Sequence, residues 1–134
     1  MTKPSNNVYQ IKVSLTGAQP PIWRRLLIEP GTTFQDLHRI IQVAMSWQAS
    51  HLHLFQAEDG RLVGDLAEDF DGMMNFVDES IVSVSSLLAR EGQSLKYEYD
   101  FGDSWEHEVK LEKILPGNSS EPLPRCVKAG RRVV

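Results

Sequence analysis

The amino-acid sequence predicts an α+β fold, in which an antiparallel or mixed sheet of two to three hairpins packs on one main helix, an arrangement of the β-grasp type. Two observations favour this class. Apolar residues alternate with polar ones in several short stretches but recur at helical spacing in one longer stretch, and turn-forming residues separate these stretches. The length of 134 residues favours a single domain over 1–134, with irregular structure at 1–7 and 117–134.

The first half of the chain is expected to form two strands and the main helix. Apolar residues alternate with polar ones over 9–15 and again over 22–28, which predicts two half-buried strands. Over 34–47 the apolar residues recur every three or four positions, which predicts an amphipathic helix. Either Thr32 or Thr33 can supply the side-chain oxygen that caps the first turn of this helix.

The second half is expected to add two hairpins. Its predicted elements are strands over 51–56, 61–64, 95–101 and 105–115, a loop over the acidic stretch 65–79, and a short helix over 84–90. The pair Asp59-Gly60 is typical of the turn of a hairpin and separates the first two of these strands. No internal repeat is present, so the elements are expected to build one core.

Charge is unevenly distributed along the chain. The sequence carries 18 acidic and 14 basic side chains, for a formal net charge of −4. From Glu58 to Glu79 there are eight acidic residues and one base, Arg61. The C-terminal stretch is basic, with Arg125, Lys128, Arg131 and Arg132. The net acidity argues against a general nucleic-acid binder, which is usually basic overall.

The composition also bears on the compartment. No apolar stretch approaches the about 18–20 residues that a membrane-spanning helix needs, and the polar segment Met1–Asn7 does not resemble a secretory signal. The single cysteine, Cys126, excludes an internal disulfide and fits a reducing compartment. We therefore expect a cytoplasmic protein.

The predicted hairpin over 95–111 gives the first candidate site. A three-residue turn, Gly102-Asp103-Ser104, would place Tyr99 opposite His107 and gather the apolar residues of both strands on one face. The other face would carry four carboxylates, those of Glu98, Asp100, Glu106 and Glu108. Like charges directly opposite each other destabilise a sheet, so these side chains are candidates for binding a basic partner or a cation. Screening by solvent and by nearby lysines is the alternative.

The histidines give the second candidate site. His51 and His53 lie two positions apart on a predicted strand, so they share a face and can bind one metal ion. The candidate ligands of a divalent metal are His51, His53, His107, Asp100 and Asp103. No His-Glu-x-x-His or paired Cys-x-x-Cys spacing supports this site, and hydrogen-bonded core histidines are the alternative.

Other motifs are weaker. Arg24 and Arg25 on a predicted strand offer two positive charges for a nucleic acid or a small anion. The sequence has no Gly-x-Ser-x-Gly elbow, no Walker A loop and no Gly-x-Gly-x-x-Gly loop, so nucleophilic or nucleotide-dependent catalysis lacks support.

Several blocks occur together with a distinctive spacing within roughly 8–130: 20–25, Leu37-His38 with Ile40-Ile41, Met45-Ser46-Trp47, 51–55 and 97–107. Together they resemble the plasmid pRiA4b ORF-3-like family, a passenger of transposons and insertion sequences that is sometimes labelled resolvase-like. The resemblance implies an α+β domain that is found in bacteria and archaea on plasmids, transposons and chromosomes. No recombinase-like serine motif or helix-turn-helix supports the resolvase label. Family members usually continue into a Pro-Pro-Glu-Asp-x-Gly-Gly block, so this chain is expected to be a C-terminally short member or a truncation.

Three functions stay open at this point. The first is an accessory or interaction module of a mobile element that binds a basic protein partner through its acidic surfaces. The second is a metal-dependent hydrolase or nuclease-like enzyme built on the histidines and aspartates, in which a bound metal would activate water. The third is nucleic-acid binding through Arg24, Arg25 and the basic tail. A divalent metal is the one cofactor considered, and no membrane partner is expected.

Overall fold

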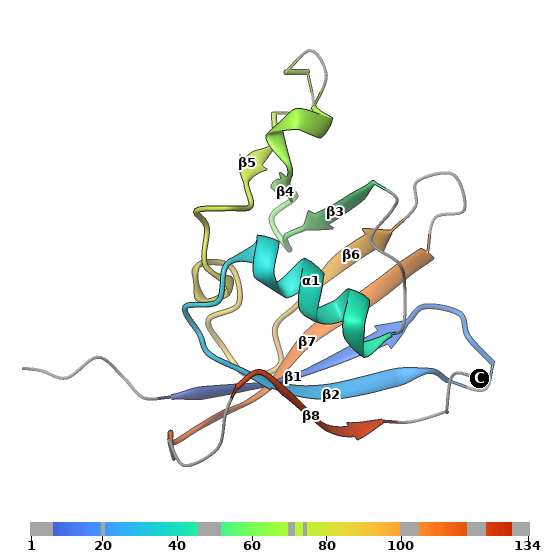
Figure 1. Cartoon of the computed structure of the whole chain (residues 1–134), viewed down its shortest axis with the longest axis vertical. Coiled ribbons are helices and arrows are strands. Elements are labelled where there is room, and N and C mark those ends of the chain that lie inside the picture. The colour runs from blue at the N-terminus through green and yellow to red at the C-terminus, as the bar shows by residue number, and fades with distance from the viewer. Residues whose placement is uncertain are drawn as a thin grey trace, which may run out of the picture.

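The computed structural model describes residues 7–19, 21–45, 52–69, 72–73, 75–99, 105–117 and 123–129. Within them the chain forms strands, one α-helix and two short 3-10 helices (Figure 1). In chain order these are β1 (Val8–Leu15), β2 (Trp23–Ile28), α1 (Phe34–Ala44), β3 (His53–Gln56), β4 (Leu62–Gly64), η1 (Leu66–Glu68), β5 (Val77–Asp78), η2 (Val84–Ser86), β6 (Ser94–Tyr99), β7 (Trp105–Leu115) and β8 (Arg125–Ala129).

All the strands belong to one eight-stranded sheet, in the order β5-β4-β3-β6-β7-β1-β2-β8. Neighbouring strands are antiparallel except for β4 and β5, which are parallel. Strand β1 lies between β2 and β7, so it joins the first hairpin of the chain to the last one. Alternate residues of these strands, among them Ile11, Val13, Val109 and Leu111, are completely buried and form the core.

Helix α1 covers one face of the sheet, which we call the inner face (Figure 1). Thr33 caps the helix, because its Oγ1 accepts a hydrogen bond from the backbone N–H of Asp36 at 3.1 Å. The apolar side of the helix is fully buried through Phe34, Leu37 and Ile41. The predicted helix is therefore confirmed over Phe34–Ala44, and Thr33 rather than Thr32 is its cap.

The predicted fold class is wrong. The sequence predicted an α+β fold of two to three hairpins packed on one main helix, whereas the described residues form a predominantly β structure with one continuous sheet and a single α-helix. The physical reason is long-range pairing. Alternation of apolar residues predicts that a stretch is a strand but not which strand it pairs with, and β1 pairs with β7 about a hundred residues further along.

Three local predictions also need correction. The stretch 117–134 was predicted to be irregular, but it contains β8, which pairs with β2. The predicted helix over 84–90 is only the 3-10 turn Val84–Ser86. The acidic stretch 65–79 holds η1 and β5. Strands as short as β5 are held by their neighbours and carry little periodicity of their own.

The hairpin of β6 and β7 keeps the predicted faces but has a different register. Tyr99 lies opposite Trp105, and Tyr97 lies opposite His107, so the pairing is shifted by two residues from the predicted one. A shift of two preserves which side chains face the core, because side chains alternate with a period of two.

In the described part of the chain, no helix is long and apolar enough to cross a membrane.

Candidate functional site

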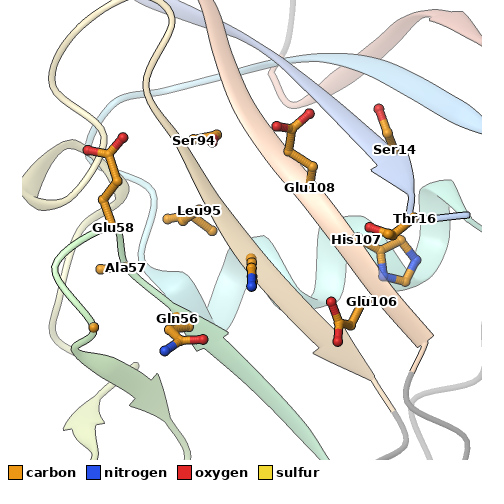
Figure 2. A pocket seen from close by; sticks show the side chains of 12 residues that line it. Ser14, Thr16, Gln56, Ala57, Glu58, Ser94, Leu95, Glu106, His107 and Glu108 are labelled. Carbon is orange, nitrogen blue, oxygen red and sulfur yellow. The ribbon is translucent and has the colours of Figure 1, made fainter.

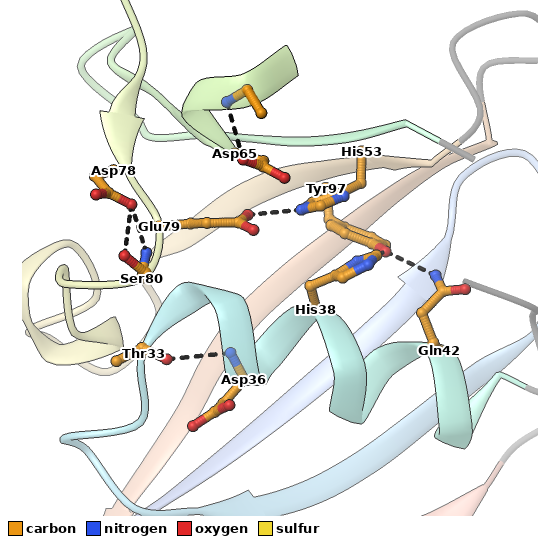
Figure 3. Close-up of polar contacts among 11 residues, drawn as sticks. Thr33, Asp36, His38, Gln42, His53, Asp65, Asp78, Glu79, Ser80 and Tyr97 are labelled. Atoms are coloured by element: carbon orange, nitrogen blue, oxygen red, sulfur yellow. Dashed lines mark hydrogen bonds and ion pairs between the residues drawn. The ribbon is translucent and has the colours of Figure 1, made fainter. Parts of the chain in front are cut away.

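Polar side chains form a buried network between α1 and the inner face of the sheet (Figure 3). His38 and Gln42 lie one helical turn apart on α1, so both reach Tyr97 of β6. Nε2 of Gln42 donates to the hydroxyl oxygen of Tyr97 at 2.8 Å, and Nδ1 of His38 lies 2.7 Å from the same oxygen. Because this oxygen accepts from Gln42, its own proton can go to Nδ1 of His38. The imidazole proton of His38 then sits on Nε2.

Burial keeps this network uncharged. Desolvation, together with the positive charges of His53 and Arg39, lowers the pKa of His38 to about 3. Burial also raises the pKa of the Tyr97 hydroxyl and lowers the pKa of His107. At neutral pH, His38, Tyr97 and His107 are therefore neutral hydrogen-bonding groups.

A buried pair of His53 and Glu79 stacks on this network. Nε2 of His53 lies 2.6 Å from Oε1 of Glu79, and the two side chains are 6% and 4% exposed. The His53 ring lies against the His38 ring, with centroids 3.5 Å apart and an angle of 9° between the planes. The backbone N–H of Glu79 donates a hydrogen bond to the carbonyl of Gly64, and the carbonyl of Glu79 accepts one from the N–H of Gln35. A buried carboxylate is costly without a partner, so the imidazole of His53 is what lets Glu79 lie in the core.

Two more ionisable residues border the network. Burial raises the pKa of Glu68 in η1, and its Oε1 has no hydrogen-bond partner among the described residues. On the other side, the His107 ring lies 5.4 Å from the Tyr97 ring between centroids, and Nδ1 of His107 donates to the Tyr97 carbonyl at 3.4 Å. The network therefore extends from η1 across β3 and β6 to β7.

The predicted metal ligands lie only partly within the described residues. His53 and His107 are both buried, on the two sides of Tyr97, and each has the hydrogen-bond partner given above. The other three candidates, His51, Asp100 and Asp103, lie outside the described residues. Over the ranges that the structure describes, no group of three His, Cys, Asp or Glu side chains is placed to hold a metal ion. A metal site therefore stays a prediction.

His38 lies at a position of the predicted helix that shares a face with Phe34, Leu37 and Ile41, but its hydrogen-bond partners were not predicted. Gln42 carried a usable signal, because a second polar residue four positions after His38 interrupts the apolar stripe on the same helix face. Glu79 carried none. It lies in a turn of a strongly acidic segment, and only the three-dimensional structure brings it to His53.

The opposite face of the sheet, here called the outer face, carries the predicted partner-binding acids. Glu106 and Glu108 are exposed on β7, Glu98 is half-buried on β6, and Asp100 lies outside the described residues. The register places Glu98 opposite Glu106 and places Lys96 opposite Glu108. Only the pair of Glu98 and Glu106 therefore brings two carboxylates opposite each other on the described part of this hairpin. Glu108 faces the base Lys96 instead.

A hollow of about 730 Å³ opens on the outer face, between the β3–β4 turn and strands β6, β7 and β1 (Figure 2). Its charged lining consists of Glu58, Glu106 and Glu108, with Lys96 as the one lysine or arginine among its lining residues. Polar residues such as Ser14 complete the wall. We refer to this feature as the acidic hollow.

The next row along the strands of the outer face is basic. Lys110 of β7 lies opposite Lys12 of β1, which lies opposite Arg25 of β2. Nζ of Lys12 and Cζ of Arg25 lie 4.9 Å and 5.1 Å from the centroid of the Trp23 ring. Arg25 also forms an ion pair with Glu112 at 2.7 Å. We refer to Lys12, Arg25 and Lys110 as the basic row.

The two arginines predicted to contact nucleic acid point to opposite faces. Arg24 is buried, and its Nε donates to the carbonyl of Ala44 at 2.9 Å, where α1 ends. Its role is therefore to hold the helix terminus. Arg25 lies on the outer face in its ion pair. In the basic tail, β8 includes Arg125 and Lys128, while Arg131 and Arg132 lie outside the described residues.

The fold and the network define a class of protein in which one helix closes a mixed eight-stranded sheet over buried His, Tyr and Glu side chains. The chain belongs to the plasmid pRiA4b ORF-3-like protein family, whose family model matches residues 7–134. The resemblance noted in the sequence is thereby confirmed.

Two relatives illustrate this membership. The chain is 35% identical over 116 residues to the uncharacterized protein y4hQ of Sinorhizobium fredii, covering 86% of this chain and 58% of that protein. It is also similar to the crystal structure of MM3350, a protein of unknown function from Methanosarcina mazei Go1. That match has a TM-score of 0.81 and 36% identity, and covers 96% of this chain and 72% of MM3350. This chain thus spans less than two thirds of the length of y4hQ.

Proposed function

We propose that this protein is an interaction module that binds a basic segment of a protein partner in its acidic hollow. The observation that carries the proposal is the lining of the hollow, in which Glu58, Glu106 and Glu108 outnumber Lys96. A hollow of about 730 Å³ is large enough for several side chains of a bound segment. The excess of carboxylates favours lysine and arginine side chains over acidic ones.

The arrangement of the charges supports the same proposal. Glu106 lines the hollow and lies directly opposite Glu98 on the neighbouring strand. A cationic side chain that enters the hollow beside Glu106 would therefore be attracted by more than one carboxylate. Binding would be favoured by this attraction between the segment and the acidic side chains.

The outer face suits this role better than the inner face does. α1 encloses the inner-face network, whose histidines and tyrosine are buried and hydrogen-bonded, whereas Glu106 and Glu108 are exposed. A partner can thus reach the hollow without any movement of the core. Association with mobile genetic elements, which the family resemblance implied, remains a prediction beside this proposal.

The test is a peptide titration followed by fluorescence anisotropy. A labelled peptide of alternating lysine and serine should bind the protein, and its affinity should fall as salt screens the charges. The peptide with glutamate in place of lysine should not bind. Glu106→Lys should weaken binding at least tenfold, or about 1.4 kcal/mol.

The matched control is Glu29→Lys, which makes the same charge change at an exposed residue outside the hollow. It should bind like the wild type apart from a small effect of net charge. Equal weakening by Glu29→Lys and Glu106→Lys would mean that the peptide responds only to net charge. Either that result, or equal binding of the lysine peptide and the glutamate peptide, would contradict the proposal.

A further inference from the structure

The basic row places three cations side by side across three neighbouring strands. Lys110 of β7 lies directly opposite Lys12 of β1, and Lys12 lies directly opposite Arg25 of β2. Neighbouring strands are about 4.8 Å apart, so these positions span on the order of 10 Å across the sheet. The register continues the row to Lys128 of β8. Like charges directly opposite each other are unfavourable in a sheet, so the row is a candidate for binding an anion.

The cations of the row are only partly neutralised by the protein. Among the described residues, neither Lys12 nor Lys110 forms an ion pair. Glu112 accepts hydrogen bonds from Nε and Nη2 of Arg25 at 2.7 Å and 3.1 Å, which leaves Nη1 as a donor. The Trp23 ring lies beside both Lys12 and Arg25 and so helps to hold them in place. Two ammonium groups and one edge of a guanidinium thus remain for an anion.

We propose that the basic row binds the phosphate chain of a small anion, which is either a free oligophosphate or a nucleoside polyphosphate. Linked phosphates concentrate several negative charges within a short distance. Ammonium and guanidinium groups both donate charge-assisted hydrogen bonds to phosphate oxygens. Three cations side by side therefore favour an anion with two or three linked phosphates over one with a single phosphate.

The surroundings of the basic row favour a small anion over a larger acidic partner. Glu108 and Glu112 lie two residues before and after Lys110 on β7, at about 7 Å, so carboxylates border the row on both sides. A short phosphate chain fits within this band, whereas a nucleic acid that extends beyond it would meet the carboxylates and the acidic hollow. An extended acidic peptide matches poorly, because its alternate side chains are about 7 Å apart and the strands are about 4.8 Å apart.

The experiment is isothermal titration calorimetry of the full chain at low salt, with inorganic tripolyphosphate, ATP and orthophosphate as probes. Tripolyphosphate should bind about tenfold more tightly than orthophosphate, and added salt should weaken its binding. Lys12→Gln and Lys110→Gln should each weaken tripolyphosphate binding roughly fivefold, the upper range for one exposed ion pair. The matched control, Arg39→Gln, removes one positive charge from an exposed side chain of α1, across the sheet from the row, and should bind like the wild type.

A second variant should change the affinity in the opposite direction. Glu112→Gln removes the carboxylate that offsets the charge of Arg25, so tripolyphosphate should bind roughly twofold more tightly. Its matched control is Glu29→Gln, which makes the same charge change at an exposed residue outside the row. A gain in affinity cannot arise from loss of folding, so this variant keeps the test valid even if a lysine variant is destabilised.

The probes also distinguish the two sources of the phosphate chain. Tighter binding of ATP than of tripolyphosphate supports a nucleotide, and the reverse supports a free oligophosphate. The inference would be overturned if neither bound, if orthophosphate bound equally well, or if Arg39→Gln weakened binding as much as Lys110→Gln. It would also be overturned if a short oligothymidylate bound more tightly than tripolyphosphate and depended equally on Lys110, because the row would then be a nucleic-acid surface. None of these outcomes depends on peptide binding in the acidic hollow.

Discussion

Acid should destabilise this protein through His38, and replacing His38 should remove that sensitivity. His38 accepts from Tyr97 in its neutral form, and burial beside His53 holds its pKa at about 3. In the unfolded chain the same side chain has a pKa of about 6.5. Below pH 6.5 His38 therefore binds a proton in the unfolded state but not in the folded state, so the free energy of unfolding falls as the pH drops toward 3.

The magnitude follows from the two pKa values. Each pH unit between 6.5 and the working pH is worth about 1.36 kcal/mol, so the contribution of His38 lost by pH 4.5 is about 2.7 kcal/mol. This is an upper limit, because water that enters the core would reduce the effect of desolvation. Above pH 6.5 the His38 contribution is constant. The ionisable groups facing His38 are His53, which pairs with Glu79, and Arg39.

The assay is urea unfolding followed by circular dichroism between pH 7.5 and 4.5. Stability of the wild type should fall more steeply than that of His38→Gln, by about 2 kcal/mol over this range. Gln42→Leu is the control, because it disturbs the same tyrosine without removing a titrating group. It should be less stable throughout but keep the wild-type slope. Equal slopes for the wild type and His38→Gln would refute the reasoning.

Three further changes test single contacts by urea unfolding at pH 7. Tyr97→Phe removes the hydroxyl that forms hydrogen bonds with two helix side chains and should lower the free energy of unfolding by about 2 kcal/mol. A decrease below about 0.5 kcal/mol would mean that these hydrogen bonds do not stabilise the fold. Arg24→Met leaves the Ala44 carbonyl unpaired and should cost about 1–3 kcal/mol, with loss of helical signal before the main transition; an unchanged helix would contradict the role of Arg24. Glu112→Gln breaks the half-buried ion pair with Arg25, which lowers the pKa of Glu112. It should cost at most about 1 kcal/mol, and the difference from the wild type should vanish as the pH falls through the pKa of Glu112.

The features that could be predicted from the sequence are those determined by interactions between residues close together in the chain. The apolar stripe and the cap of α1 depend on residues within four positions of each other, so the sequence located the helix. The hairpin of β6 and β7 shows the limit of this approach. Its alternation decided which residues face the core, but the turn length decided the register, and Tyr97 faces His107 rather than Val109.

The remaining features depend on contacts between distant parts of the chain. The fold class was missed because one sheet arises when β1 pairs with both β2 and β7. The buried network was only half visible, because a histidine on an apolar helix face signals burial but does not identify its partner. Glu79 meets His53 from 26 residues away, through a turn whose composition alone favours exposure to solvent.

The central place of β1 has a consequence for how the protein is made. β1 leaves the ribosome before the other strands of this sheet, yet one of its two neighbours, β7, ends at Leu115. During synthesis the hairpin of β1 and β2 must therefore wait with both edges unpaired, because β8, the other neighbour of β2, is made later still, and an unpaired edge can pair with other chains. Contacts so distant along the chain are formed slowly. The nascent protein should thus depend on rapid completion of β7, or on a chaperone at that edge, more than a protein with local strand pairing would.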